Sequence, residues 1–267
     1  MPFIELNGIE IHYDTSGSGP ALILIPGWGG SGESWRSEMI NLLASRFTVI
    51  TYDPRGTGQS DKPNEPYTTK RFADDVVELL KQLHLTSAHI LGFSMGGSIA
   101  QVVALEHPEI VQSLILCSTS ALGGPRFPMD PQNAKKFASI RNPPPGSPLD
   151  YGARVIIELL YPPEYVKAHR DELIREEYYS EHPTPKETLN HMSALGETYN
   201  AYEKLHLIRI PTLILAGGAD VMVSLENSQV IASRIPGARL RIFPGAGHGL
   251  LKQMTKEAVA EILAFLP

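Results

Sequence analysis

The stretch Gly92-Phe93-Ser94-Met95-Gly96-Gly97 decides the fold of this chain. It joins an apolar run at 88–93, which has the length and composition of a buried strand, to a run at 95–107 that we expect to be a helix. A serine with glycines two positions away on both sides is typical of a tight strand-to-helix turn, because the neighbouring backbone leaves room only for glycine. Such a turn raises a strained serine above the end of a sheet. The motif therefore predicts that Ser94 is a nucleophile.

Strand-like and helix-like runs alternate on both sides of this turn. Such alternation is typical of a mostly parallel sheet covered by helices on both faces. At the beginning of the chain, Asn7-Gly8 between two short β-type runs predicts an antiparallel hairpin. We therefore expect an α/β fold with an eight-stranded sheet. The expected strands are 3–6, 9–15, 21–25, 47–52, 88–93, 111–117, 212–216 and 239–243, and the expected helices begin near 34 and cover 70–83, 95–107 and 250–266.

The segment 122–207 interrupts the alternation. It contains the turn-forming run Pro143–Pro148 and no convincing strand, and its other stretches have helical spacing. We expect it to form a helical cap, or lid, over a core domain made of 1–121 and 208–267. The expected cap helices are 133–140, 150–160, 163–178 and 186–195.

A serine hydroxyl is a weak nucleophile until a base removes its proton. Among nine histidines, His248 stands apart, because glycines surround it in a loop that follows the last strand. The base also needs a carboxylate that fixes its tautomer. Asp220 follows the strand 212–216 closely, whereas the strand 111–117 is followed by Ser118 and other hydroxyl residues. We therefore predict a catalytic triad of Ser94, Asp220 and His248.

A glycine-rich loop, Gly27-Trp28-Gly29-Gly30-Ser31-Gly32, allows two interpretations. It matches the Gly-x-Gly-x-x-Gly pattern of dinucleotide sites, and Asp53 lies where a ribose-binding acid would sit. An NAD(P)-dependent oxidoreductase is therefore one alternative. However, a hairpin precedes the loop, Asp53 leads into the turn-rich run 54–60, and this alternative leaves the predicted triad unexplained.

In the other interpretation the same loop forms part of an oxyanion hole. Acyl transfer places negative charge on the carbonyl oxygen, which backbone N–H groups must stabilise. One N–H comes from the residue after the nucleophile, Met95, and the second comes from the loop after the third strand, where Trp28 is the expected donor. Trp28, Val221 and Leu250 adjoin these positions, so we expect them to line the substrate pocket.

These motifs together resemble the α/β-hydrolase superfamily, and in particular its serine esterase and lactonase members. The resemblance covers nearly the whole chain and implies that Asp53 and Arg55 are structural. Two departures stand out: Pro26-Gly27 where family members often have His-Gly, and Val221-Met222 where a proline often follows the acid. The motifs are 26–30, 53–60, 92–97, 217–220 and 245–249.

The resemblance implies a serine hydrolase that cleaves a small-molecule carboxylic ester through an acyl-enzyme, without a cofactor or metal. A lactone, an enol-lactone or a carbon–carbon bond is the nearest alternative substrate. Ser94 argues against dehalogenases and epoxide hydrolases, which have aspartate at the elbow. A small-molecule receptor that retains the triad but hardly turns over is an alternative of a different class. The sequence does not indicate the acyl-chain length, the leaving group or the oligomeric state.

Composition excludes several other classes of protein. The chain has 267 residues, 42% of them hydrophobic and 19% charged, and its net charge is −6. A mildly acidic chain is a poor partner for nucleic acid or an anionic membrane. Cys117 is the one cysteine, so no internal disulfide can form. Without a membrane-spanning run or a signal-like beginning, we expect a cytoplasmic location.

Overall fold

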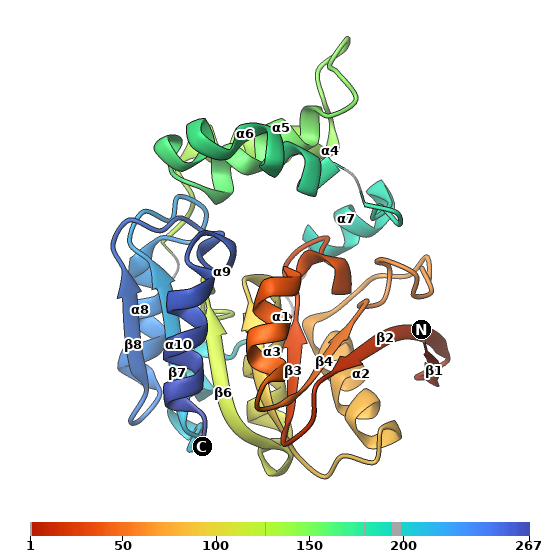
Figure 1. The fold of residues 1–267 in the computed structure, drawn as a ribbon, viewed down its shortest axis with the longest axis vertical. Coiled ribbons are helices and arrows are strands. Elements are labelled where there is room, and N and C mark those ends of the chain that lie inside the picture. Colours follow the sequence, from red (N-terminus) through yellow and green to blue (C-terminus); the bar gives the residue numbers. More distant parts are fainter. Residues whose placement is uncertain (1, 126, 179, 194–198) are drawn as a thin grey trace.

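The computed structural model describes residues 2–125, 127–178, 180–193 and 199–267. An eight-stranded sheet with the order β1-β2-β4-β3-β5-β6-β7-β8 runs through the molecule (Figure 1). β2 pairs antiparallel with β1 and with β4, and all other neighbouring strands are parallel. The strands are β1 (Phe3–Leu6), β2 (Ile9–Ser16), β3 (Ala21–Ile25), β4 (Thr48–Tyr52), β5 (Ala88–Phe93), β6 (Val111–Cys117), β7 (Thr212–Gly217) and β8 (Arg239–Phe243).

Helices cover both faces of the sheet, so the predicted fold class is confirmed. Both faces of the sheet are apolar and need a cover, as the alternating side chains of β3 show. Ile23 and Ile25 belong to one buried cluster, whereas Leu22 and Leu24 belong to the other. The first cluster includes side chains of α2 (Thr69–Gln82), α3 (Met95–Glu106) and α8 (Leu225–Arg234), and the second includes those of α1 (Ser37–Ala44), α9 (Leu250–Gln253) and α10 (Thr255–Phe265).

Four further helices lie beyond the ends toward which the parallel strands point (Figure 1). They belong to the segment for which we expect a cap, and we call them the cap helices. Two of them pack on each other through a small buried cluster around Ile157 and Leu173, whereas Met192 of the last one belongs to the buried cluster on one face of the sheet. These helices are α4 (Pro131–Arg141), α5 (Tyr151–Leu160), α6 (Pro163–Tyr178) and α7 (Lys186–Ser193). None of the described helices is long and apolar enough to cross a bilayer.

The helix bounds differ from the predictions at a few points. The helix expected from about residue 34 is preceded by the 3-10 turn η1 (Gly32–Ser34), because the Ser34 hydroxyl accepts the Ser31 N–H at 3.0 Å and closes that turn. The expected closing helix is broken at Met254, whose φ of −127° is not helical. α8 was missed, as were the 3-10 turns η2 (Pro108–Ile110) and η4 (Tyr202–Leu207). The expected end of α7 at residue 195 lies outside the described residues.

Candidate active site

Ser94 lies on the turn between β5 and α3, with a φ of 52° and a ψ of −118°. A positive φ is strained for a residue with a side chain, so the surroundings must hold it in place. Glycine is required on both sides: a Cβ at Gly92 would lie 2.3 Å from the Gly96 carbonyl oxygen, and one at Gly96 would lie 2.1 Å from that of Ile25. The Ser94 carbonyl in turn accepts the Thr119 hydroxyl at 2.7 Å. The strand-to-helix turn predicted from the sequence is therefore present.

Three side chains from separate loops form a hydrogen-bonded relay. His248 Nε2 lies 2.9 Å from Ser94 Oγ, and His248 Nδ1 lies 2.8 Å from Asp220 Oδ2. The other oxygen of Asp220, Oδ1, accepts the backbone N–H groups of Met222 and Val223, both at 2.8 Å. Asp220 and His248 are buried, so bulk water does not weaken the contact between them. The relay can accept a proton from the Ser94 hydroxyl at one end and stabilise the resulting imidazolium at the other.

The loop that carries His248 is held by contacts from both the sheet and the cap helices. The hydroxyl of Ser118, which follows β6, donates to the His248 carbonyl at 3.0 Å. From the other side, the Leu160 carbonyl at the end of α5 accepts the Gly249 N–H at 2.8 Å. A Cβ at Gly247 would lie 2.5 Å from the same carbonyl oxygen, which explains why a glycine precedes the histidine.

Two backbone N–H groups beside Ser94 are free for a ligand. Met95 is the first residue of α3, where N–H groups lack partners within the helix and the helix dipole favours negative charge. Trp28 lies in the loop after β3. Neither N–H donates a hydrogen bond to another described residue of the chain. Both residues line the same cavity as Ser94.

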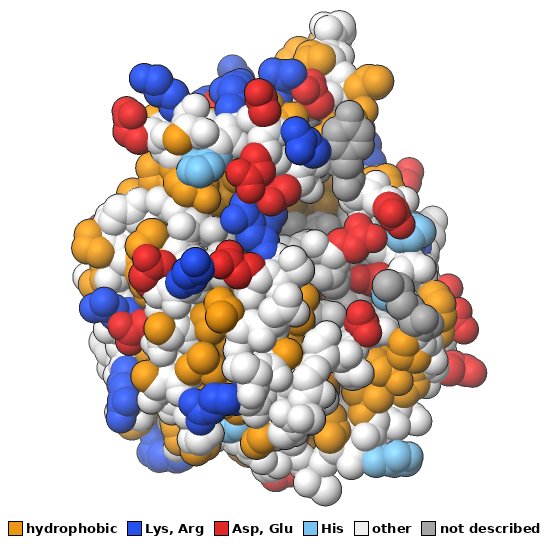
Figure 2. Space-filling model, in the orientation of Figure 1, with side chains coloured by type: hydrophobic (Ala, Val, Ile, Leu, Met, Phe, Trp, Pro, Cys, Tyr) orange, Lys and Arg blue, Asp and Glu red, His pale blue; other side chains and the backbone are white. Residues whose placement is uncertain are grey.

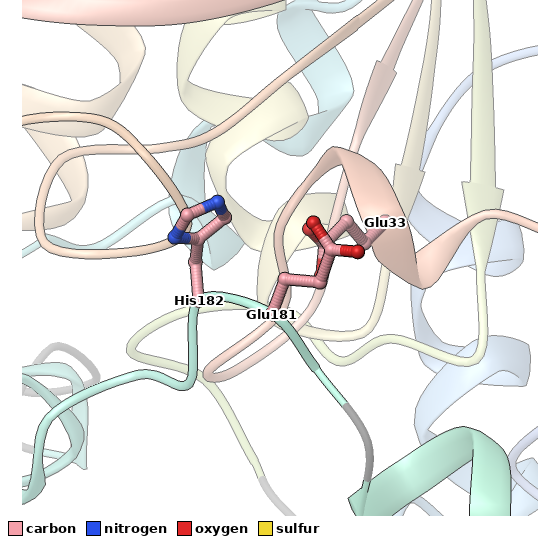
Figure 3. Close-up of side chains that lie close together, drawn as sticks. All are labelled: Glu33, Glu181 and His182. Carbon is pink, nitrogen blue, oxygen red and sulfur yellow. The ribbon is translucent and has the colours of Figure 1, made fainter.

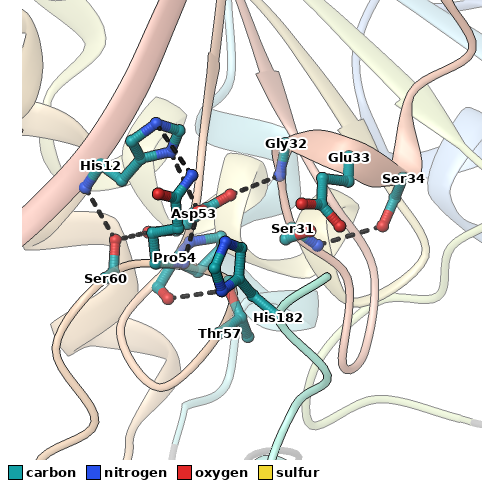
Figure 4. A network of polar contacts seen from close by, with 12 residues as sticks. His12, Ser31, Gly32, Glu33, Ser34, Asp53, Pro54, Thr57, Ser60 and His182 are labelled. Atoms are coloured by element: carbon teal, nitrogen blue, oxygen red, sulfur yellow. Dashed lines mark hydrogen bonds and ion pairs between the residues drawn. The ribbon is translucent and has the colours of Figure 1, made fainter. Parts of the chain in front are cut away.

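Asp53 anchors the glycine-rich loop at Gly32 (Figure 4). Its Oδ1 accepts the Gly32 N–H at 2.8 Å, and its Oδ2 accepts the Gln59 N–H at 2.8 Å and lies 3.0 Å from His12 Nδ1. The side chain is only 3% exposed, so a ribose could not reach its oxygens. These contacts argue against the dinucleotide interpretation and give Asp53 a structural role. Arg55 is also structural, since it is fully buried against Asp75.

A cavity of about 1200 Å³ separates the sheet from the cap helices, and Ser94 and His248 lie in its wall. Space-filling atoms show the molecule hollowed between these two parts (Figure 2). The cap contributes mainly apolar side chains to the cavity. They include Met129, Phe137, Ile140, Ile156, Leu160, Leu189 and Met192. The cavity-lining residues recur at helical spacing, which marks the inward faces of α4 and α5 and could have predicted them from the sequence. They are Phe137 and Ile140 on α4, and Ala153, Ile156 and Leu160 on α5.

Two of the three predicted pocket residues do not line the cavity. Val221 is 43% exposed. It lies in the turn where the N–H groups of Met222 and Val223 bind the Asp220 carboxylate, and this turn directs the Val221 side chain outward. Leu250 is fully buried in the core. Trp28 does line the cavity. Residues adjacent in sequence to Val221 and Leu250 line it in place of those two. These neighbours are Met222, Val223, Gly249 and Leu251.

Comparison with known proteins places the chain in a family. A family model for the alpha/beta hydrolase fold matches residues 20–253. The chain belongs to the α/β-hydrolase family. A putative carbamate hydrolase, RutD of Caulobacter sp. (strain K31), is 32% identical over 96% of this chain and 94% of its own.

Solved structures agree with this assignment. A hydrolase from Pseudomonas aeruginosa has 28% identity and a TM-score of 0.85, and it covers 99% of this α/β-hydrolase and 97% of its own chain. Est816, described as an N-acyl homoserine lactone degrading enzyme, has 27% identity and a TM-score of 0.83, with 99% and 100% of the two chains covered.

Oppositely charged side chains join the cap helices of this α/β-hydrolase to the part of the chain that contains the sheet, and such side chains gather at the junction in Figure 2. Arg36, which precedes α1, lies 3.1 Å from Glu176 of α6, and Lys252 of α9 lies 3.0 Å from Glu177. Burial works to lower the pKa of Arg36, but the nearby Glu176 carboxylate outweighs it and raises that pKa above its usual value. These pairs line the cavity, so charged side chains stand in its wall beside the apolar side chains of the cap helices.

Glu33, Glu181 and His182 form one group of side chains in this α/β-hydrolase that could hold a metal ion. One possible ligand atom from each residue lies within 4.8 Å of the others (Figure 3). Glu33 comes from η1, and the other two come from the loop between α6 and α7. Both carboxylates are exposed, and exposed acidic groups are common without a bound ion.

Proposed function

We propose that this α/β-hydrolase is a serine hydrolase that cleaves a small-molecule carboxylic ester through an acyl-enzyme. The observation that supports the proposal most strongly is the buried relay from Asp220 through His248 to Ser94, with contacts of 2.8 and 2.9 Å, which ends in a large cavity. A hydroxyl in contact with an oriented imidazole is the arrangement that activates serine for attack on an acyl carbon.

Each step of the proposed cycle assigns a role to one of these groups. His248 Nε2 removes the Ser94 proton while Oγ forms a bond to the acyl carbon. The tetrahedral intermediate then collapses, the bond to the leaving oxygen breaks, and His248 returns the proton to the departing alcohol. Water repeats the sequence on the acyl-enzyme, so the products are one acid and one alcohol. Asp220 keeps the proton on Nδ1 throughout.

The backbone N–H groups of Trp28 and Met95 are proposed to form the oxyanion hole. Both are free of other described partners, and both residues line the cavity beside Ser94. Because they are backbone groups, they are in place before the charge develops and need little reorganisation.

The cavity suggests an ester with a sizeable apolar part. Its volume of about 1200 Å³ exceeds that of most small-ligand pockets, which reach roughly 1000 Å³. Met129, Phe137 and Ile156 of the cap face it, so an acyl chain could rest against them. In this proposal residues 122–207 act as the cap domain, and 1–121 with 208–267 form the core that carries the chemistry.

Lactones and carbamates are second candidates because related proteins bear those names. Est816, at 27% identity, degrades N-acyl homoserine lactones according to its description, and the RutD relative at 32% identity is called a putative carbamate hydrolase. Both substrates would offer an acyl carbon to Ser94 and use the same relay.

A substrate panel with matched alkoxide leaving groups tests the proposal. We would measure kcat/KM for ethyl butyrate, γ-butyrolactone and ethyl carbamate with the native enzyme and with Ser94→Ala. The proposal predicts that the ester is the best substrate and that Ser94→Ala abolishes its turnover. Preference for the lactone or carbamate would reassign the substrate, and stoichiometric binding without turnover would favour a receptor.

A further inference from the structure

The loop that carries the Trp28 N–H is anchored at two ends by different parts of the protein. At Gly32 it is held by Asp53 of the core, 2.8 Å away. At Trp28 and Gly29, in contrast, side-chain contacts come from the cap helices and the residues that precede α7. The position of the proposed oxyanion donor therefore depends on where the cap lies.

The indole of Trp28 is held between two cap helices. Its Nε1 donates to the Leu189 carbonyl at 3.2 Å and to the Ser193 hydroxyl at 3.1 Å, both on α7. Its ring contacts Phe137 of α4, with 4.7 Å between the ring centroids. The Ser193 hydroxyl is fixed by its own bond to Leu189, so the acceptor for the indole is held in place.

The next residue, Gly29, is held by two further cap side chains. Its N–H donates to the Met192 sulfur at 3.4 Å, and its carbonyl accepts the Thr184 hydroxyl at 2.9 Å. Its φ of 69° favours glycine, and a Cβ there would lie 2.8 Å from a methyl carbon of Leu189. The peptide on each side of Gly29 is thus oriented by the cap and fits closely against it.

We propose that Met192 and Thr184 are positioning residues for the oxyanion hole, and that the seated cap is what aims the Trp28 N–H at the reacting carbonyl. This inference rests on the proposed function of that N–H. A donor must sit within hydrogen-bond distance of the oxyanion, and a displacement of about 1 Å can cost about 100-fold in rate.

The test uses substitutions that remove the contacts and keep the size of the side chains. Met192→Leu loses the sulfur acceptor, and Thr184→Val loses the hydroxyl donor. A Leu-for-Met exchange is well tolerated in packed sites. Met254→Leu, at the break between α9 and α10 in the core, is the matched control. Thr184 is only half-buried, so Thr184→Val alone serves if the double variant fails to fold.

We expect the double variant to lose about 10- to 100-fold in kcat, since the oxyanion donor is misplaced and not removed. KM should stay nearly unchanged. A trifluoromethyl ketone forms a tetrahedral adduct with the serine, and its inhibition constant should rise by the same factor by which kcat falls. Met254→Leu should match the native enzyme in kcat, KM and inhibition constant.

Unchanged kcat and inhibition in the variants would overturn the positioning role, as would a rise in KM alone. Activity that survives Ser94→Ala would instead refute the proposed function, so the two failures can be told apart.

Discussion

Replacement of Asp220 by asparagine probes the relay with almost no change in shape. The structure offers the new amide two orientations. In the first, its oxygen takes the place of Oδ1 and keeps the N–H groups of Met222 and Val223, which lie at 2.8 Å. Its NH2 group then faces His248 Nδ1. His248 Nδ1 must then accept a hydrogen bond, so the ring proton moves to Nε2. A protonated Nε2 can no longer take a proton from Ser94.

The second orientation restores the tautomer and costs two hydrogen bonds. The amide oxygen then faces His248, and the NH2 group faces the two backbone donors, which lose their acceptor. A buried donor without a partner costs about 1–3 kcal/mol, so the active orientation lies roughly 2–6 kcal/mol higher. At about 1.4 kcal/mol per tenfold, kcat should fall by roughly 30-fold to 2 × 10⁴-fold. The corresponding change in a serine protease costs about 10⁴-fold.

The assay is steady-state hydrolysis of a p-nitrophenyl ester by the native enzyme, Asp220→Asn and Glu257→Gln. The last variant removes one exposed negative charge from α10 and controls for the change in net charge. Thermal unfolding checks that each variant is folded. A folded Asp220→Asn enzyme that keeps its kcat within about threefold of the native value would refute the assignment of Asp220, because threefold is less than 1 kcal/mol of barrier.

Three further predictions concern the scaffold. Burial raises the pKa of the fully buried Cys117 thiol, so iodoacetamide at pH 8 should label it only after unfolding; rapid labelling of the native chain would show that the site is open. Asp75→Ala should lower the free energy of unfolding by about 3–5 kcal/mol in denaturant titration, because it removes two of the three charge-assisted hydrogen bonds of the buried Arg55 guanidinium and leaves only the contact with Glu65; a loss under about 1 kcal/mol would contradict the importance of this buried pair. Gly96→Ala should destabilise the fold and abolish activity, since its Cβ would lie 2.1 Å from a carbonyl oxygen, whereas Gly245→Ala, with open space around it, should not; equal effects would mean that the elbow is less tight than described.

The sequence predicted the sheet and the candidate triad because both depend on local rules. Apolar runs of strand length and the glycines around Ser94 leave few alternatives, and the carboxyl ends of parallel strands meet at one edge of a sheet. Asp220 and His248 follow such strands, so their convergence on Ser94 could be anticipated.

The cavity walls depend on contacts that no local rule encodes. Val221 and Leu250 were placed by their nearness in sequence to Asp220 and His248, but a one-residue difference in a turn decides which side chain faces inward. The contacts of Met192 and Thr184 with the glycine-rich loop join positions more than 150 residues apart, and they depend on how the cap helices sit on the sheet.

The central claim is that Ser94 is the nucleophile, and covalent labelling tests it most directly. We would treat the native enzyme and Ser94→Ala with a fluorophosphonate, measure the intact masses, and locate the adduct by peptide mapping. The account predicts one adduct per native chain, on Ser94, with loss of activity in step with labelling and no adduct on the variant. An adduct on another residue, or an enzyme that hydrolyses esters at the native rate without Ser94, would contradict it.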